Sequence, residues 1–121
     1  MRDKVNLESA FTMFDERWSP KIVAALNGQH VRVAKLEGEF CWHKHDDQDE
    51  LFLVVQGRLR LLLRDREIVL EPGELFVVPS GVEHKPVADG LAHVLLFEPA
   101  ETLNTGDAED ARKHEDLDWL A

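Results

Sequence analysis

Residues 38–57 read GEFCWHKHDDQDELFLVVQG and carry the most informative pattern of the chain. Three side chains with metal-binding groups, His43, His45 and Glu50, lie close together in this stretch. On a β-strand, residues i and i+2 point to the same face, so His43 and His45 should project together. Glu50 lies at an odd spacing from both and can join them only if the strand breaks in the acidic run between. Together with His84 further along, the pattern predicts a divalent-metal pocket inside a β-barrel.

The chain around this stretch has the texture of many short strands separated by turn signals. Asn27-Gly28 predicts a two-residue hairpin turn, and Pro72-Gly73 suits a type II turn. Turn signals every eight to twelve residues or so predict an all-β sandwich or barrel with antiparallel pairing. Residues 6–14 are expected to form a short helix capped by Asn6, with a strand as the alternative. The expected strands are residues 21–26, 30–36, 38–45, 50–55, 58–63, 68–70, 74–78 and 91–97.

Size and charge limit the possible functions. A length of 121 residues suggests a single domain over residues 1–121, with a barrel over about 18–99 and an acidic tail over 101–121. The hydrophobic fraction of 44% suffices for one core. A net charge of −10 argues against nucleic acid and anionic membranes as partners. The single cysteine and the lack of a secretory or bilayer-spanning apolar run predict a cytoplasmic protein.

The tail has a composition of its own. Residues 101–121 contain seven acidic and two strongly basic residues, a local net charge of −5. We expect a solvated tail with a short helix capped by Asp107, and a substrate lid is the alternative. The apolar side chains that could pin its end to the barrel are Leu117, Trp119 and Leu120.

Two motifs resemble those of the cupin superfamily. Its first motif reads G-x5-H-x-H-x3–4-E-x6-G, and the stretch from Gly38 to Gly57 matches it, except that the first glycine stands one residue too close to the first histidine. Its second motif reads G-x5-P-x-G-x2-H-x3-N, and the stretch from Gly73 to His84 matches it, with Ala88 in place of the closing Asn. The chain resembles small bacterial single-domain cupins of the mannose-6-phosphate-isomerase-like kind. This resemblance implies an antiparallel β-barrel or jelly roll with short helical or irregular terminal segments.

The resemblance also implies a metal site. In the family the matching residues bind one metal, so the implied ligands here are His43, His45, Glu50 and His84. Three imidazoles and one carboxylate suit one divalent transition metal, namely Fe, Mn, Ni, Zn or Cu. Four ligands in a six-coordinate site leave two positions for other molecules. The alternative is a cupin that has kept the fold and lost the metal.

The implied function is a metal-dependent enzyme, an oxidoreductase or isomerase, that acts on a small organic substrate by dioxygenase- or isomerase-type chemistry. Glu50 is expected to act catalytically as a proton carrier as well as a ligand. His93, on the last long strand, is a candidate acid–base group if its ring reaches the pocket. The alternative is a non-catalytic module that senses or stores a small ligand or a metal.

Alternation along the expected strands assigns the neighbouring side chains to a face. Cys41 should face the interior as a buried small hydrophobe, with a redox-sensitive thiol as the alternative. The side chains of opposite parity, expected outside, are Phe40, Trp42, Leu51 and Leu53. An apolar outer face needs a cover, so we expect a homodimer, with the N-terminal segment as the alternative cover. The residues expected in the core or around the pocket are Phe52, Val54, Phe76 and Val78.

Overall fold

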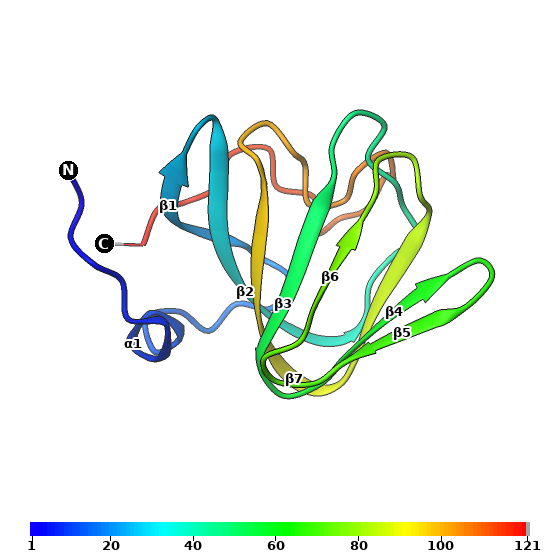
Figure 1. The fold of residues 1–121 in the computed structure, drawn as a ribbon, viewed down its shortest axis with the longest axis horizontal. Coiled ribbons are helices and arrows are strands. Elements are labelled where there is room, and N and C mark those ends of the chain that lie inside the picture. Colours follow the sequence, from blue (N-terminus) through cyan, green and yellow to red (C-terminus); the bar gives the residue numbers. More distant parts are fainter. Residues whose placement is uncertain (121) are drawn as a thin grey trace.

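The computed structural model describes residues 1–120, and within them the chain forms seven strands and one short helix (Figure 1). All pairings between these strands are antiparallel, which confirms the predicted all-β class. The elements are α1 (Leu7–Phe11), β1 (Lys21–Leu26), β2 (Gln29–Glu39), β3 (Glu50–Gln56), β4 (Leu59–Leu63), β5 (Glu67–Leu70), β6 (Leu75–Val78) and β7 (His84–Pro99).

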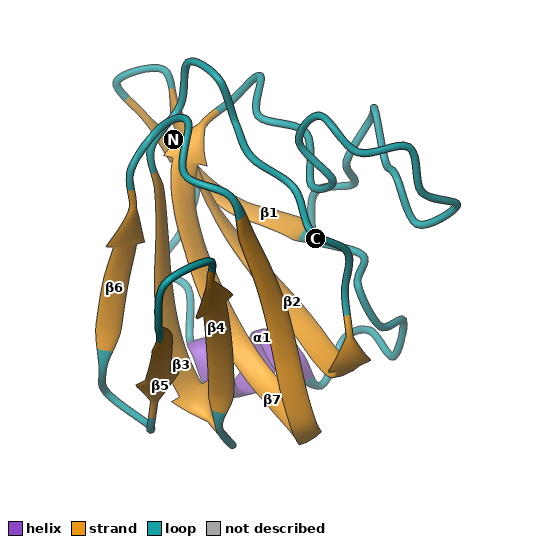
Figure 2. Ribbon diagram, turned by 90° about the vertical axis from the view of Figure 1, so that its right-hand side faces the viewer, coloured by secondary structure: helices purple, strands orange, loops and turns teal. Residues whose placement is uncertain are grey.

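The long strand β7 organises the barrel. The strand order is β1-β2-β7-β3-β6, and β4 pairs with both β5 and β7. Residues 84–87 of β7 pair with β4, whereas residues 93–97 pair with β3, so this one strand joins the β4–β5 hairpin to the rest of the sheet. Figure 2 shows the strands standing around a common interior, with α1 near their lower ends. This arrangement is a jelly-roll barrel, as the two motifs implied.

Two apolar clusters stabilise the fold. The larger fills the barrel interior, and the smaller lies between α1 and the strands β1 and β2. Helix α1 begins after Asn6, whose side chain accepts a hydrogen bond from Ser9 N at 2.9 Å, so the predicted capped helix is confirmed, although it ends at Phe11. The smaller cluster comprises Ala10, Phe11, Phe14, Val23 and Val33.

Within residues 1–120 no helix is long and apolar enough to cross a membrane.

The turn between β1 and β2 is the predicted hairpin. Asn27 and Gly28 both have positive φ, 51° and 75°, as a type I′ turn requires. Alternation along β3 is also confirmed, because Phe52 and Val54 are buried while Leu51 and Leu53 are only half-buried.

The strand expected over residues 38–45 is not formed, and the prediction was wrong there. Strand β2 ends at Glu39, after a shift in its pairing with β7 between Leu36 and Gly38. Beyond that point the chain makes only an isolated bridge at His43, so the alternation of faces no longer applies. Phe40, expected outside, is therefore buried in the barrel interior. Trp42 stays half-buried, with the Arg64 guanidinium 3.8 Å from its ring centroid.

The C-terminal segment also differs from the prediction. Residues 101–120 contain turns rather than a helix, so the expected helix capped by Asp107 is not formed. The segment is docked on the barrel, since Thr105 is fully buried and Ile22 exchanges backbone hydrogen bonds with Asp118 and Leu120 at 2.9 and 3.0 Å. In Figure 1 it returns, in orange and red, to the side of β1. The predicted anchoring by Leu120 is thus confirmed, and Ala121 lies outside the described residues.

Candidate metal centre

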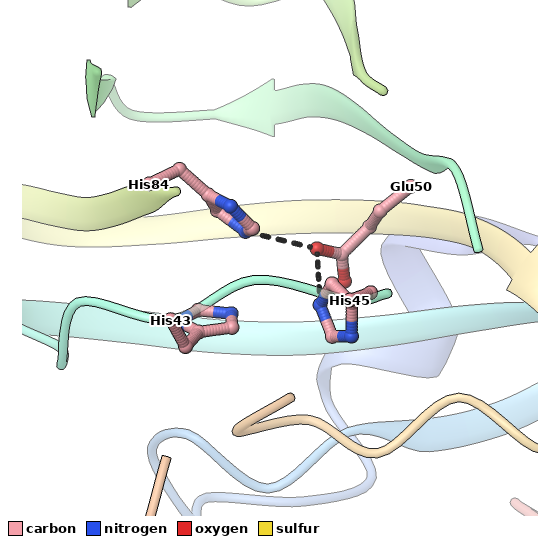
Figure 3. Close-up of side chains that lie close together, drawn as sticks. All are labelled: His43, His45, Glu50 and His84. Atoms are coloured by element: carbon pink, nitrogen blue, oxygen red, sulfur yellow. Dashed lines mark ion pairs between the residues drawn. The ribbon is translucent and has the colours of Figure 1, made fainter. Parts of the chain in front are cut away.

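Four side chains from three parts of the chain converge inside the barrel (Figure 3). His43 and His45 lie on the loop after β2, Glu50 is the first residue of β3, and His84 is the first residue of β7. The backbones of His43 and His84 exchange two hydrogen bonds, of 2.9 and 3.0 Å, which place the two motifs side by side. All four side chains are buried, with 5% exposure or less.

The four groups are close enough to share one ion. One potential ligand atom from each residue can be chosen so that all lie within 4.8 Å of one another. Glu50 Oε1 lies 3.2 Å from His45 Nε2 and 3.4 Å from His84 Nε2. The structure therefore brings together the four residues that the motifs implied, although they do not share one regular strand.

Backbone carbonyls orient two of the imidazole rings. The Nδ1 atoms of His43 and His84 lie 2.9 and 3.0 Å from the carbonyl oxygens of Cys41 and Val82. A carbonyl oxygen can only accept, so each Nδ1 carries the hydrogen and each Nε2 keeps its lone pair. Second partners of this kind set the tautomer and orientation of metal-binding histidines.

The polar atoms that face one another in the cluster lack other partners. Among the described residues, His45 Nε2, Glu50 Oε1 and His84 Nε2 are buried and accept or donate no hydrogen bond. A buried polar atom left in this state costs about 1–3 kcal/mol. Lone pairs that converge in this way fit a cation, which would satisfy all of them at once.

Burial controls the charge of these groups. It lowers the pKa of His43 to about 4, and the neighbouring His84 adds to this effect, so the ring is neutral at pH 7. Burial also acts to raise the pKa of Glu50, but contacts with His45, His84 and Glu98 outweigh it and hold the pKa well below its ordinary value. The centre thus presents a neutral imidazole and a carboxylate, the forms that ligate metals.

A buried ion pair lies next to the centre, and sequence reasoning missed it. Arg32 and Glu98 are each 1% exposed, and Arg32 donates to Glu98 Oε1 at 2.8 Å. Arg32 also donates to the carbonyl oxygens of Ala100 and Thr102 at 2.8 and 2.9 Å. Burial, and after it the carboxylate of Glu50, raises the pKa of Glu98 well above its ordinary value. Arg32 acts in the opposite direction, so burial and Glu50 outweigh its effect on this pKa.

The signal for this pair was present in the alternation of the strands. Arg32 has the parity of the buried Ala34 on β2, and Glu98 has the parity of the buried Leu96 on β7. Charged residues are rarely buried unless they are paired, so charged residues at two inward positions predict either a functional site or a buried ion pair.

His93 does not join the cluster. Its ring stacks on Phe11 of α1, with centroids 4.4 Å apart, whereas its neighbour Val94 points into the barrel interior. The strand places the two on opposite faces, so the expected reach of His93 into the pocket is not observed. Cys41 packs half-buried at the edge of the interior cluster, where burial raises the pKa of its thiol.

A small cavity of about 30 Å³ adjoins the four residues. It is far smaller than the roughly 150 Å³ that accepts benzene in a protein core. Its walls are largely apolar, with Trp18 and Phe40 stacked at a centroid distance of 4.5 Å, and Asn104 contributes from the C-terminal segment. The volume of the cavity corresponds to about two water molecules. Of the residues expected in the core or around the pocket, Phe52 lines the cavity, Val54 and Val78 lie in the core, and Phe76 packs against that core half-buried.

Fold and cluster together define a class of protein: a small antiparallel jelly-roll barrel whose interior gathers three histidines and a glutamate that could bind a metal. The model of the Cupin_2 family, described as a cupin domain, matches residues 29–98. The chain therefore belongs to the cupin family.

Relatives agree with this assignment. A cupin-2 domain protein from Shewanella frigidimarina has a TM-score of 0.78 and 42% identity, over 78% of this chain and 93% of that one. Protein NMB1881 from Neisseria meningitidis has a TM-score of 0.74 and 27% identity, over 81% of this chain and 100% of that one. The uncharacterized protein YdbB of Bacillus subtilis is 38% identical over 64 residues, which make up 52% of this chain and 57% of that protein. The chain thus matches little more than half the length of this curated relative.

Proposed function

We propose that this cupin is a metal-dependent enzyme that binds one divalent transition metal through His43, His45, Glu50 and His84 and acts on a small organic molecule. The observation that carries the proposal is the convergence of unpartnered, buried Nε2 and carboxylate atoms around one point. The donor set is nitrogen and oxygen without a thiolate, which suits Fe, Mn, Ni, Zn or Cu. When bound, such an ion supplies a Lewis acid or a redox centre beside the substrate.

The chain's own residues would hold the substrate and move its proton. Apolar walls at Trp18, Phe40 and Phe52 favour a substrate with an apolar body, whose polar end faces the cluster. Glu50 would carry a proton if it detached from the metal, and the neighbouring Glu98, whose pKa burial and Glu50 hold well above its ordinary value, could exchange a proton with it. Such a pair suits dioxygenase- or isomerase-type chemistry, in which a carbon or oxygen atom of the substrate loses or gains a proton. His93 has no part in this proposal.

A second candidate is a non-catalytic module that stores or senses a metal or a small ligand. The observation that favours it is the small cavity, about 30 Å³, beside the cluster. Oxygen uptake and product analysis with diketones, thiols, aromatic diols and sugar phosphates, each with Fe(II), Mn(II) and Zn(II), separate the two. Turnover supports the enzyme, whereas thermal stabilisation without turnover supports the module.

Metal content is the first test. Purified or reconstituted protein should carry about one equivalent of transition metal by elemental analysis. His45→Ala should lose most of it, because it removes one of four ligands. His93→Ala is the matched control and should keep the metal, since that ring packs on Phe11. Protein that takes up no metal, even after reconstitution, would contradict the proposal.

We also infer that a second copy of the chain covers the outer face of β3 and β6. Leu75 and Val77 on β6 are 57% and 42% exposed, and they pair with the half-buried Leu53 and Leu51 on β3. An apolar face on an edge strand is a ready interface. Light scattering after size exclusion should give a dimer, and Val77→Lys should give a monomer. A monomeric wild type at micromolar concentration would reject the inference.

A further inference from the structure

The C-terminal strap, which we define as residues 102–112, crosses the loop that carries two of the three clustered histidines. Asp107 N donates to Lys44 O at 3.0 Å, and Lys44 N donates to Asp107 Oδ1 at 2.9 Å. Lys44 is the residue between His43 and His45. The strap therefore binds both the amide and the carbonyl group of the residue between the two histidines.

Gly106 is the point of closest approach. Its φ is +55°, and a Cβ placed there would collide with Lys44 O and lie only 2.9 Å from Cδ2 of the His43 ring. No side chain fits at this position unless the backbone of the strap or of the loop at Lys44 shifts. The strap backbone thus packs directly against one of the proposed metal ligands.

The strap is itself firmly anchored. Thr105, next to Gly106, is fully buried. Arg112 donates to Glu39 O at 2.9 Å, forms two 2.8 Å contacts with the carboxylate of Asp110, and lies 4.6 Å from the ring centroid of Phe40. Asn104 ties the strap to itself by donating to Arg112 O at 2.8 Å. Contacts thus hold both ends of the loop from residue 39 to residue 45.

The loop has few restraints of its own. Its backbone bonds to the rest of the barrel are those of Phe40 N with Pro86 O, of His43 with His84, and of Gly81 N with His45 O. Between these bonds and the start of β3 the chain follows no strand ladder. A ligand-bearing loop of this kind needs support if its side chains are to stay in binding geometry.

We propose that the strap is a positioning element of the metal centre: Gly106 and Asp107 fix the backbone around Lys44 and so hold His43 and His45 in the orientation that binds metal. The strap touches no reacting atom. This inference rests on the proposed function for the metal, but the ordering of the loop is independent of it.

Matched glycine variants test the proposal. Gly106→Ala introduces both the positive-φ strain and the collision, whereas Gly73→Ala introduces only the strain, since Gly73 has φ +86° and open space around its α-carbon. Asp107→Ala removes the acceptor of Lys44 N at a surface position, so it should leave the fold intact. Zn(II) and Mn(II) affinities should fall about tenfold in Gly106→Ala and Asp107→Ala, the range for outer partners of metal ligands, and change less than twofold in Gly73→Ala.

Hydrogen exchange of the metal-free protein gives the second readout. The His43 amide bonds to His84 O at 3.0 Å and reports the placement of the loop. It should exchange about tenfold faster in Gly106→Ala and Asp107→Ala than in the wild type or Gly73→Ala. Unchanged exchange in both variants would overturn the proposal, even if the affinity fell. A wild type that binds no metal would refute the proposed function, and exchange at His43 would still decide the role of the strap.

Discussion

Acid should destabilise the metal-free protein, because His43 is buried as a neutral ring. The pKa of this ring falls from its ordinary 6.5 to about 4 in the folded chain, chiefly through burial. Between these two pH values the unfolded chain binds a proton that the folded chain does not, so the free energy of unfolding falls as the pH falls. At about 1.4 kcal/mol per pKa unit, this single group removes about 3 kcal/mol between pH 7 and pH 4.

The assay is guanidinium unfolding at a series of pH values from 7.5 to 4, in buffer with a chelator so that no metal competes with the proton. His43→Asn serves as the comparison, since its amide can still donate to Cys41 O but does not titrate. The variant will be less stable throughout, but its profile should be flatter than that of the wild type. The difference between the two profiles, about 3 kcal/mol over the range, isolates His43 from the carboxyl groups that titrate in the same interval.

Two profiles that run parallel to within 0.5 kcal/mol or so would refute this reasoning. The ring would then titrate near its ordinary pKa in the folded chain, and the burial of His43 would have no effect on its charge. An NMR titration of the His43 ring provides the direct check, with an expected midpoint of about 4.

Two further substitutions test the packing around the centre. Phe52→Ala should lower the free energy of unfolding by about 3–5 kcal/mol in guanidinium titrations, because it empties a buried site in the barrel interior beside His84; a loss under about 1 kcal/mol would mean that the interior collapses around the gap. Arg32→Met should cost about 3–5 kcal/mol in the same assay, because it leaves Glu98 and the carbonyl of Thr102 buried without their donor. Stability equal to the wild type would show that the buried pair adds nothing over an apolar contact.

Some features of the fold and of the metal centre could be predicted, because they depend on neighbouring residues or follow from motif spacing. The turn at Asn27-Gly28 requires two residues that tolerate positive φ, and this preference is a property of the dipeptide itself. The inward placement of Glu50 follows from the alternation of a regular strand, in which Phe52 has the same parity. The match of two spaced motifs then implied that His84 joins the other three residues.

Other features could not be predicted, since they depend on contacts between distant parts of the chain. Phe40 was expected outside because alternation assumes a continuous strand, yet pairing with β7 shifts near Gly38 and the strand ends at Glu39. Where no ladder continues, side-chain direction is set by the available partner, and here that partner is Trp18 from a segment far away in sequence.

By itself, the sequence predicted the antiparallel barrel, because turn preference and alternation act over a few neighbouring positions, and it indicated the four candidate metal ligands through their match to the spaced motifs of a known family. Only the tertiary structure decided that an acidic tail packs as a strap on the histidine loop, with Gly106 against His43. It alone also placed Glu98 beside Glu50, with a pKa raised by burial. Burial and packing are properties of the assembled molecule, since each depends on every segment that excludes water from the same place.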